Sequence, residues 1–167
     1  MSESQRGHTL IELMVALSLV GILAVLAVQN LGSRISHYSL RHAGQQLAAD
    51  LRTIRQKAIT EGFSHKIRFM PDLLRYDLPG IAERSLPSQI RFGLNTNVPR
   101  LPDAGSIPSD GISFVENKVT FQPNGTIVGL GGTVYLTDDS ARHDTLAVTV
   151  NVTGRVKIYR WNGEKWK

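Results

Sequence analysis

A long apolar run near the amino terminus constrains this chain more than any other feature of its sequence. Between residues 13 and 28 only Ser18 and Gly21 interrupt the apolar side chains. As a helix with a rise of about 1.5 Å per residue, residues 10–28 approach the roughly 30 Å thickness of a bilayer's hydrocarbon core. The run therefore predicts a helix of membrane-spanning length.

One acid, Glu12, lies inside this apolar run. A lone acid at membrane depth costs on the order of 2.5–3.5 kcal/mol on insertion scales, so it requires a partner and a purpose. A free amino terminus, generated by a cut just after Gly7, would supply that partner. Arg6 stands directly before the run, and a cation there favours keeping this end of the chain in the cytoplasm.

The residues around this acid carry a resemblance to a known class of proteins. Gly7 followed by His-Thr-Leu-Ile-Glu-Leu-Met-Val resembles the processing site of type IV prepilins and type II secretion pseudopilins. In that class a prepilin peptidase cleaves after the glycine and methylates the new amino terminus. The resemblance implies cleavage between Gly7 and His8, N-methylation of His8, and pairing of Glu12 with a neighbouring subunit's terminus. The class usually has phenylalanine at the position of His8.

Two other interpretations of the apolar run are weighed against this one. A secretory signal peptide has a basic start and an apolar core, but here an acid lies within the core and no A-x-A site closes it. An anchor with one span, in a periplasmic protein unrelated to filaments, also tolerates an acid near its end. The identity of the first residue of the mature chain distinguishes such an anchored protein from a pilin.

Length and composition bound the rest of the chain. Its 167 residues allow one membrane helix and one modest globular domain. We predict a leader at 1–7, a transmembrane half-helix at 8–31, an amphipathic half-helix at 32–61 and a β-rich domain at 62–167. The sequence has no cysteine, which excludes a disulfide framework and a thiolate metal site. The formal charge of +5 is compatible with an anionic partner and also with simple solubility.

Beyond the apolar run, the spacing of apolar residues predicts that the helix continues to Glu61. Small and apolar side chains recur every three or four residues, which is the period of an amphipathic helix face. Gly62 stands where a glycine cap is expected. The members of this stripe are Leu40, Gly44, Leu47, Leu51, Ile54 and Ala58, widened by Ala43 and Ala48.

After Gly62 the pattern changes to short runs that are typical of β-strands, separated by turns. The long segment Asn95–Gly111 contains three prolines and is predicted to be an exposed loop. One helix followed by many short strands indicates an α+β, pilin-like fold with a long amino-terminal helix packed on an antiparallel sheet domain. The predicted strands are His65–Met70, Leu73–Leu78, Gln89–Leu94, Ile112–Glu116, Lys118–Gln122, Thr126–Val128, Thr133–Thr137, Asp144–Val152 and Arg155–Trp161.

Three further segments make the resemblance more specific. Leu47–Arg52, Phe121–Gly125 and Thr153–Lys157 are similar to segments of the GspH/FimT family of minor pilins and pseudopilins. The resemblance implies a minor subunit of a type II secretion pseudopilus or a type IV pilus, assembled through its first helix. Its partners would be other pilin subunits, the prepilin peptidase and the bacterial inner membrane. The protein would cross that membrane once, with a cytoplasmic amino terminus and a periplasmic domain, before it enters a filament.

The sequence does not indicate an enzyme. The five histidines are scattered, no His-Glu-x-x-His pattern occurs, and no nucleophile and base can be paired from their spacing. The glycine-rich stretch 129–132 precedes a predicted strand and lacks the Lys-Ser/Thr of a phosphate loop. We predict no cofactor and no metal.

The carboxyl-terminal end carries a second candidate activity. Alternation in a strand would place Arg155, Lys157, Tyr159 and Trp161 on one face, with Arg160 close by. Cations interleaved with aromatic rings suit a nucleic-acid backbone and its bases. In the family, members that act in natural transformation bind DNA through a Gly-Arg-x-Arg element, which residues 154–157 resemble with lysine in place of the second arginine. Alternatively, the rings pack under a loop and the cations are solvated.

Overall fold

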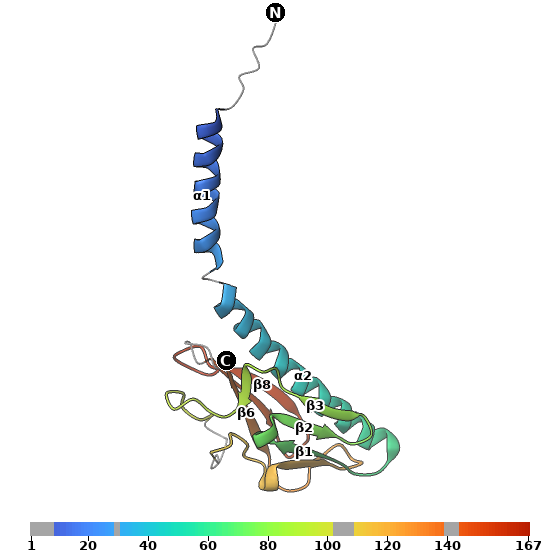
Figure 1. Cartoon of the computed structure of the whole chain (residues 1–167). Helices are drawn as coiled ribbons and strands as arrows, with labels where there is room; N and C mark the ends of the chain where they lie inside the picture. The colour runs from blue at the N-terminus through green and yellow to red at the C-terminus, as the bar shows by residue number, and fades with distance from the viewer. Residues whose placement is uncertain (1–8, 29–30, 102–108, 139–143) are drawn as a thin grey trace, which may run out of the picture. The chain divides into compact units, whose positions relative to one another are not determined.

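A computed structural model describes residues 9–28, 31–101, 109–138 and 144–167 (Figure 1). The chain divides into two compact units, Met1–Ile35 and Ser36–Lys167. Gly7 and His8, where processing is predicted, lie outside the described residues, as do parts of the loop predicted at Asn95–Gly111.

The first unit contains helix α1, Leu10–Val28. Thr9 caps its start, because the Thr9 hydroxyl accepts a 3.3 Å hydrogen bond from the backbone N–H of Glu12. Glu12 lies in the first turn, where the helix dipole favours an acid. Among the described residues, no helix has the length and hydropathy expected of a membrane span.

Helix α2, Leu31–Glu61, ends where the sequence predicts. Gly62 has a φ of +74° and donates its N–H to the carbonyl of Ala58 at 3.1 Å, which is a glycine cap. The predicted stripe is buried from Leu40 to Ala58. At Gly44 an added Cβ would lie 2.5 Å from Leu146, so the glycine lets a strand approach the helix closely.

In the described part of the second unit, the strands form two antiparallel sheets of four strands each. The first has the order β3-β2-β1-β5 and the second the order β4-β6-β7-β8. A single apolar cluster joins residues of α2 to residues of both sheets. The α+β class, with a helix packed on antiparallel sheets, is therefore confirmed. The strands are β1 His65–Met70, β2 Arg75–Leu78, β3 Ala82–Ser85, β4 Ile90–Phe92, β5 Lys118–Phe121, β6 Gly132–Asp138, β7 Thr145–Val150 and β8 Val156–Arg160.

Two predicted strands do not form, and one strand that forms was not predicted. At Thr126–Val128 only Ile127 pairs, in an isolated bridge to Phe121. The strand predicted at Ile112–Glu116 does not form, because Glu116 and Asn117 take left-handed backbone angles in a short 3-10 turn, η2, at Val115–Asn117. Only Ile112 pairs there, in an isolated bridge to Val134. The edge strand β3 was not predicted at all, since its sequence Ala-Glu-Arg-Ser has no apolar alternation.

The hairpin of β1 and β2 also differs in detail from the prediction. A second 3-10 turn, η1 at Pro71–Leu73, precedes Leu74, which has a φ of +50°. β2 therefore begins at Arg75, two residues after the predicted start at Leu73.

Candidate functional site

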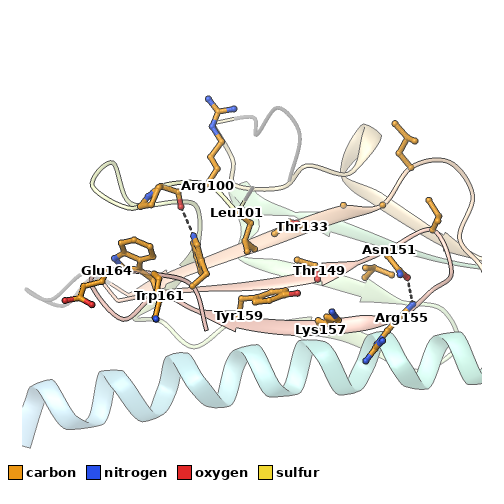
Figure 2. Close-up of a pocket in the computed structure, with 18 residues that line it drawn as sticks. Arg100, Leu101, Thr133, Thr149, Asn151, Arg155, Lys157, Tyr159, Trp161 and Glu164 are labelled. Carbon is orange, nitrogen blue, oxygen red and sulfur yellow. Dashed lines mark hydrogen bonds between the residues drawn. The ribbon is translucent and has the colours of Figure 1, made fainter. Parts of the chain in front are cut away.

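Strand β8 presents alternating side chains to two faces, as predicted. Its register against β7 places Lys157 opposite Thr149 and Tyr159 opposite Ala147. Val156 is buried in the apolar cluster, with Ile158 packed against it. The four side chains of the opposite face line one groove, shown in Figure 2: Arg155, Lys157, Tyr159 and Trp161.

The groove has a second wall that comes from a distant part of the chain. Trp166 Nε1 donates a 2.8 Å hydrogen bond to the carbonyl of Pro99, and the N–H of Leu101 donates to the Tyr135 hydroxyl at 3.2 Å. Burial raises the pKa of Tyr135. The groove is open to solvent along its length, and its volume of about 1060 Å³ is at the upper end of the range of small-molecule pockets, so it can take an extended ligand.

A small hairpin at the carboxyl terminus supplies Trp166. The backbones of Arg160 and Lys167 exchange two hydrogen bonds of 2.8 and 3.0 Å. The rings of Trp161 and Trp166 meet edge to face with centroids 5.7 Å apart. The turn between them is held by Asn162 Oδ1, which accepts the N–H groups of residues 164 and 165. Sequence reasoning missed Trp166, although two tryptophans flanking Asn-Gly are a recognisable hairpin signal.

Arg160 does not lie with the other four predicted residues. It follows Tyr159 in the strand, so alternation directs it away from the groove. Its Nη2 lies 3.9 Å from Oδ2 of Asp144. Of the five candidate DNA-binding residues, the structure brings four together and leaves Arg160 on the other face.

The groove has an unbalanced charge. Its lining contains Arg100, Arg155, Lys157 and Lys165 but only one acid, Glu164, a net of +3. Several cations of the first sheet are neutralised in pairs: Arg75 pairs with Glu83 at 2.7 Å, and Lys118 pairs with Glu116. Among the described residues, Arg155 and Lys157 of the groove have no such ion pair, so their charge is available to an anionic ligand.

Helix α2 fixes the strand that carries these cations. Arg55 Nε donates a 2.8 Å hydrogen bond to the carbonyl of Gly125, and Arg52 Nη2 donates to the carbonyl of Val156 at 3.3 Å. Gly154 has a φ of +73°, and a Cβ there would lie 2.0 Å from the carbonyl oxygen of Gly125. The three segments that resemble the family, Leu47–Arg52 on the helix and the turns in Phe121–Gly125 and Thr153–Lys157, therefore lie close to Arg55.

In the first unit, Glu12 is exposed at the start of α1. The large apolar side chains described between Leu10 and Leu23 are 54–79% exposed, on all sides of the helix. Glu12 is the sole charged residue of α1. Both the acid and the apolar surface are thus available to other molecules.

Comparisons with known proteins agree with this arrangement. The prokaryotic N-terminal methylation motif matches residues 4–28. Type II secretion system protein H of Xanthomonas campestris pv. campestris is 33% identical over 112 residues. That match covers 65% of this chain and 66% of the relative, just under two thirds of each.

Two solved structures have the same fold. The type IV minor pilin FimU of Pseudomonas aeruginosa superposes with a TM-score of 0.54 at 14% identity, over 78% of this chain and 94% of that one. The minor pseudopilin EpsH of Vibrio cholerae superposes with a TM-score of 0.52 at 13% identity, over 75% and 99%. At these identities the likeness concerns the fold alone.

The motif, the relative and the fold confirm the resemblance on which the sequence interpretation rests. The chain therefore carries the prokaryotic N-terminal methylation motif, and about two thirds of it is similar to a type II secretion system protein H.

Proposed function

We propose that this chain is a minor pseudopilin subunit that assembles through α1 into a short filament of the type II secretion kind. One observation carries the proposal: α1 exposes apolar side chains on every side and has a single acid, Glu12, in its first turn. An apolar surface of this extent requires cover from lipid or from other helices. The similarity to a protein H of type II secretion favours the pseudopilus over the pilus.

Assembly would begin with processing. A prepilin peptidase would cut between Gly7 and His8 and methylate His8, within the matched motif. Glu12 would then be the fifth residue of the mature chain. Its carboxylate would pair with the amino terminus of a neighbouring subunit, offsetting the cost of holding an acid in apolar surroundings.

The proposed location before assembly is the bacterial inner membrane, with the amino terminus in the cytoplasm and residues 62–167 in the periplasm. The matched methylation motif, and not charge, supports this orientation, because the cation Arg6 before the run is offset by Arg34 and Arg41 after it. α1 would lie in lipid at this stage and among the helices of other subunits afterwards.

The experiment that tests the role of Glu12 is a pair of variants in the full chain. Glu12→Ala removes the carboxylate, and we expect normal membrane insertion with loss of incorporation into filaments. Ser18→Ala is the matched control in the same helix, because the Ser18 hydroxyl bonds only to the carbonyl of Met14 at 2.8 Å among the described residues. Normal incorporation of Glu12→Ala would refute the proposed pairing.

Mass spectrometry of the mature amino terminus tests the processing step separately. An N-methylated His8 is the expected product. A chain that retains Met1, or that is cut near Ala27, would instead be a protein with a simple anchor or a cleaved signal peptide.

A second candidate function, DNA binding in uptake, has one observation in its favour. Arg155 and Lys157 line the same groove as the rings of Tyr159 and Trp161. If DNA is the ligand, binding should fall steeply with rising salt because phosphate contacts release counterions. It should also be lost in an Arg155→Ala/Lys157→Ala double variant. Titration of labelled single-stranded and duplex DNA with the purified chain tests this alternative.

A further inference from the structure

We propose that the groove beside β8 binds an extended, acidic segment of a partner protein in the same assembly. The inference rests on the proposed function, since it assigns a docking surface to the domain that α1 would bring into a filament. The groove is defined by Lys157 and Tyr159 of β8, by Arg155 and Trp161 at the two ends of that strand, and by the facing wall at residues 99–101 (Figure 2).

Charge complementarity identifies the sign of the partner's charge. Four cations and one acid line the groove, and among the described residues neither Arg155 nor Lys157 is in an ion pair. Such a surface attracts carboxylates and repels a basic segment. The partner is therefore acidic.

The spacing of the cations identifies an extended backbone. Arg155 and Lys157 are two residues apart along a strand, which is about 6.6–6.8 Å at 3.3–3.4 Å per residue. Side chains on one face of an extended peptide have the same spacing, so two acids at positions i and i+2 match the two cations. From Arg155 to Trp161 the groove is about 20 Å long, enough for roughly six extended residues.

Exposed apolar residues favour a polypeptide over a nucleic acid. At one end of the groove Leu130 is 83% exposed and Val152 is 49% exposed. A peptide can bury an apolar side chain against them, whereas the outside of a nucleic acid offers phosphates. At the other end, the rings of Trp161 and Trp166 form an aromatic anchor of the kind that dominates binding energy at protein interfaces.

The edge of β8 is protected at both ends, which directs the partner onto the face of the sheet. The carbonyl of Val156 is occupied by Arg52, and the backbone of Arg160 is paired with Lys167. A partner that added a strand to this edge would have to displace both. The hydrogen bond from Trp166 to Pro99 already holds the far side of the groove in place, so a partner can bind there with little rearrangement of the chain.

The test uses the full chain in detergent and fluorescein-labelled synthetic peptides, with binding followed by fluorescence anisotropy. The probe is Leu-Ser-Glu-Ser-Glu-Ser-Phe, which has two acids at i and i+2 between apolar ends. We expect saturable binding that weakens about tenfold in the Arg155→Ala/Lys157→Ala double variant. The Arg41→Ala/Lys66→Ala double variant removes two exposed cations outside the groove and should bind as the unaltered chain does.

Two comparison probes make the test specific. A peptide with lysine in place of both glutamates should not bind, and one with serine in place of leucine and phenylalanine should bind several-fold more weakly. An eight-residue thymidine oligonucleotide tests the nucleic-acid alternative. The proposal is overturned by absence of peptide binding, by equal loss in both double variants, or by oligonucleotide binding without peptide binding.

The same variants separate this inference from the proposed function. Glu12→Ala should lose filament incorporation and keep peptide binding, because Glu12 and the groove lie in different compact units. Peptide binding without any incorporation of the unaltered chain would refute the filament proposal and leave the groove assignment intact.

Discussion

The phenolic hydroxyl of Tyr76 donates a 2.7 Å hydrogen bond to Oδ2 of Asp50, and both side chains are buried. Gln46 donates to Oδ1 at 2.9 Å from the preceding turn of α2, and Arg84 Nε donates to Oδ2 at 3.2 Å from β3. One carboxylate thus joins the helix to two adjacent strands of the first sheet. A buried acid is tolerated there because each of its oxygens accepts hydrogen bonds.

Tyr76→Phe should lower the free energy of unfolding by about 1–2 kcal/mol, because it removes one of the buried hydrogen bonds to a charged acceptor. Urea denaturation measures the loss. Tyr159→Phe is the matched control, since no hydrogen bond of its hydroxyl to the described residues is present, and it should change stability by less than about 0.5 kcal/mol. Equal effects of the two substitutions would exclude a stabilising role for the Asp50–Tyr76 bond.

The domain should lose stability at alkaline pH. Burial, with the adjacent Asp50 carboxylate, raises the pKa of Tyr76 well above its usual range. In the unfolded chain a tyrosine ionises near pH 10. Above that pH the unfolded state releases the proton and the folded state keeps it, so stability is complete below about pH 10 and falls as pH rises.

Urea midpoints recorded between pH 8 and pH 11 measure this effect. The decline should be shallower in Tyr76→Phe, which has no phenol at that position. Tyr135, whose pKa is also raised by burial, would account for part of the remaining slope. An unchanged slope in Tyr76→Phe would contradict the assignment to Tyr76.

The features that could be predicted from the sequence are the ones that depend on local periodicity. The stripe on α2 and the alternation of β8 follow from repeats of 3.6 and 2 residues, and both are present. The strand predicted at Ile112–Glu116 failed because consecutive left-handed residues, Glu116 and Asn117, interrupt an otherwise apolar run. Neither glutamate nor asparagine predicts a left-handed backbone as strongly as glycine does.

The walls of the groove could not be predicted, because they depend on contacts between distant residues. Trp166 and Pro99 are 67 positions apart, and Arg55 and Gly125 are 70 apart. Their association follows from the order of strands in the two sheets, which periodicity does not determine. The sequence therefore identified the cationic face of β8 but not the residues that make it a groove.

Gly154→Ala should be among the most destabilising single-methyl substitutions in the domain. A φ of +73° costs an L-residue roughly 1–2 kcal/mol, and the new Cβ would also collide with the carbonyl oxygen of Gly125. We expect a total loss above about 3 kcal/mol, measured by urea denaturation. The substitution should also displace Arg155 and so weaken anion binding in the groove.

Gly129→Ala provides the control for backbone strain alone. Gly129 has a similar φ of +83°, but no atom lies within 4 Å of an added Cβ. Its loss should stay near the roughly 1–2 kcal/mol of the left-handed conformation. If both substitutions cost the same, the close approach of Gly154 to Gly125 does not contribute to stability.

Trp166→Ala should release the far wall of the groove. The substitution removes the hydrogen bond to Pro99 and the edge-to-face contact with Trp161, together worth roughly 1–2 kcal/mol. Coupling of two close indole rings gives a paired positive and negative band in far-ultraviolet circular dichroism, and this signal should disappear. Amide hydrogen exchange of Leu101, whose N–H is bonded to Tyr135, should accelerate.

Trp161→Ala separates the two contributions. It also removes the ring pair, so the coupled dichroism signal should vanish in the same way. It keeps the bond from Trp166 to Pro99, however, so exchange at Leu101 should remain close to that of the unaltered chain. Protection at Leu101 that survives in both variants would mean that Tyr135 alone holds the 99–101 segment, because its hydroxyl would then suffice without the indole.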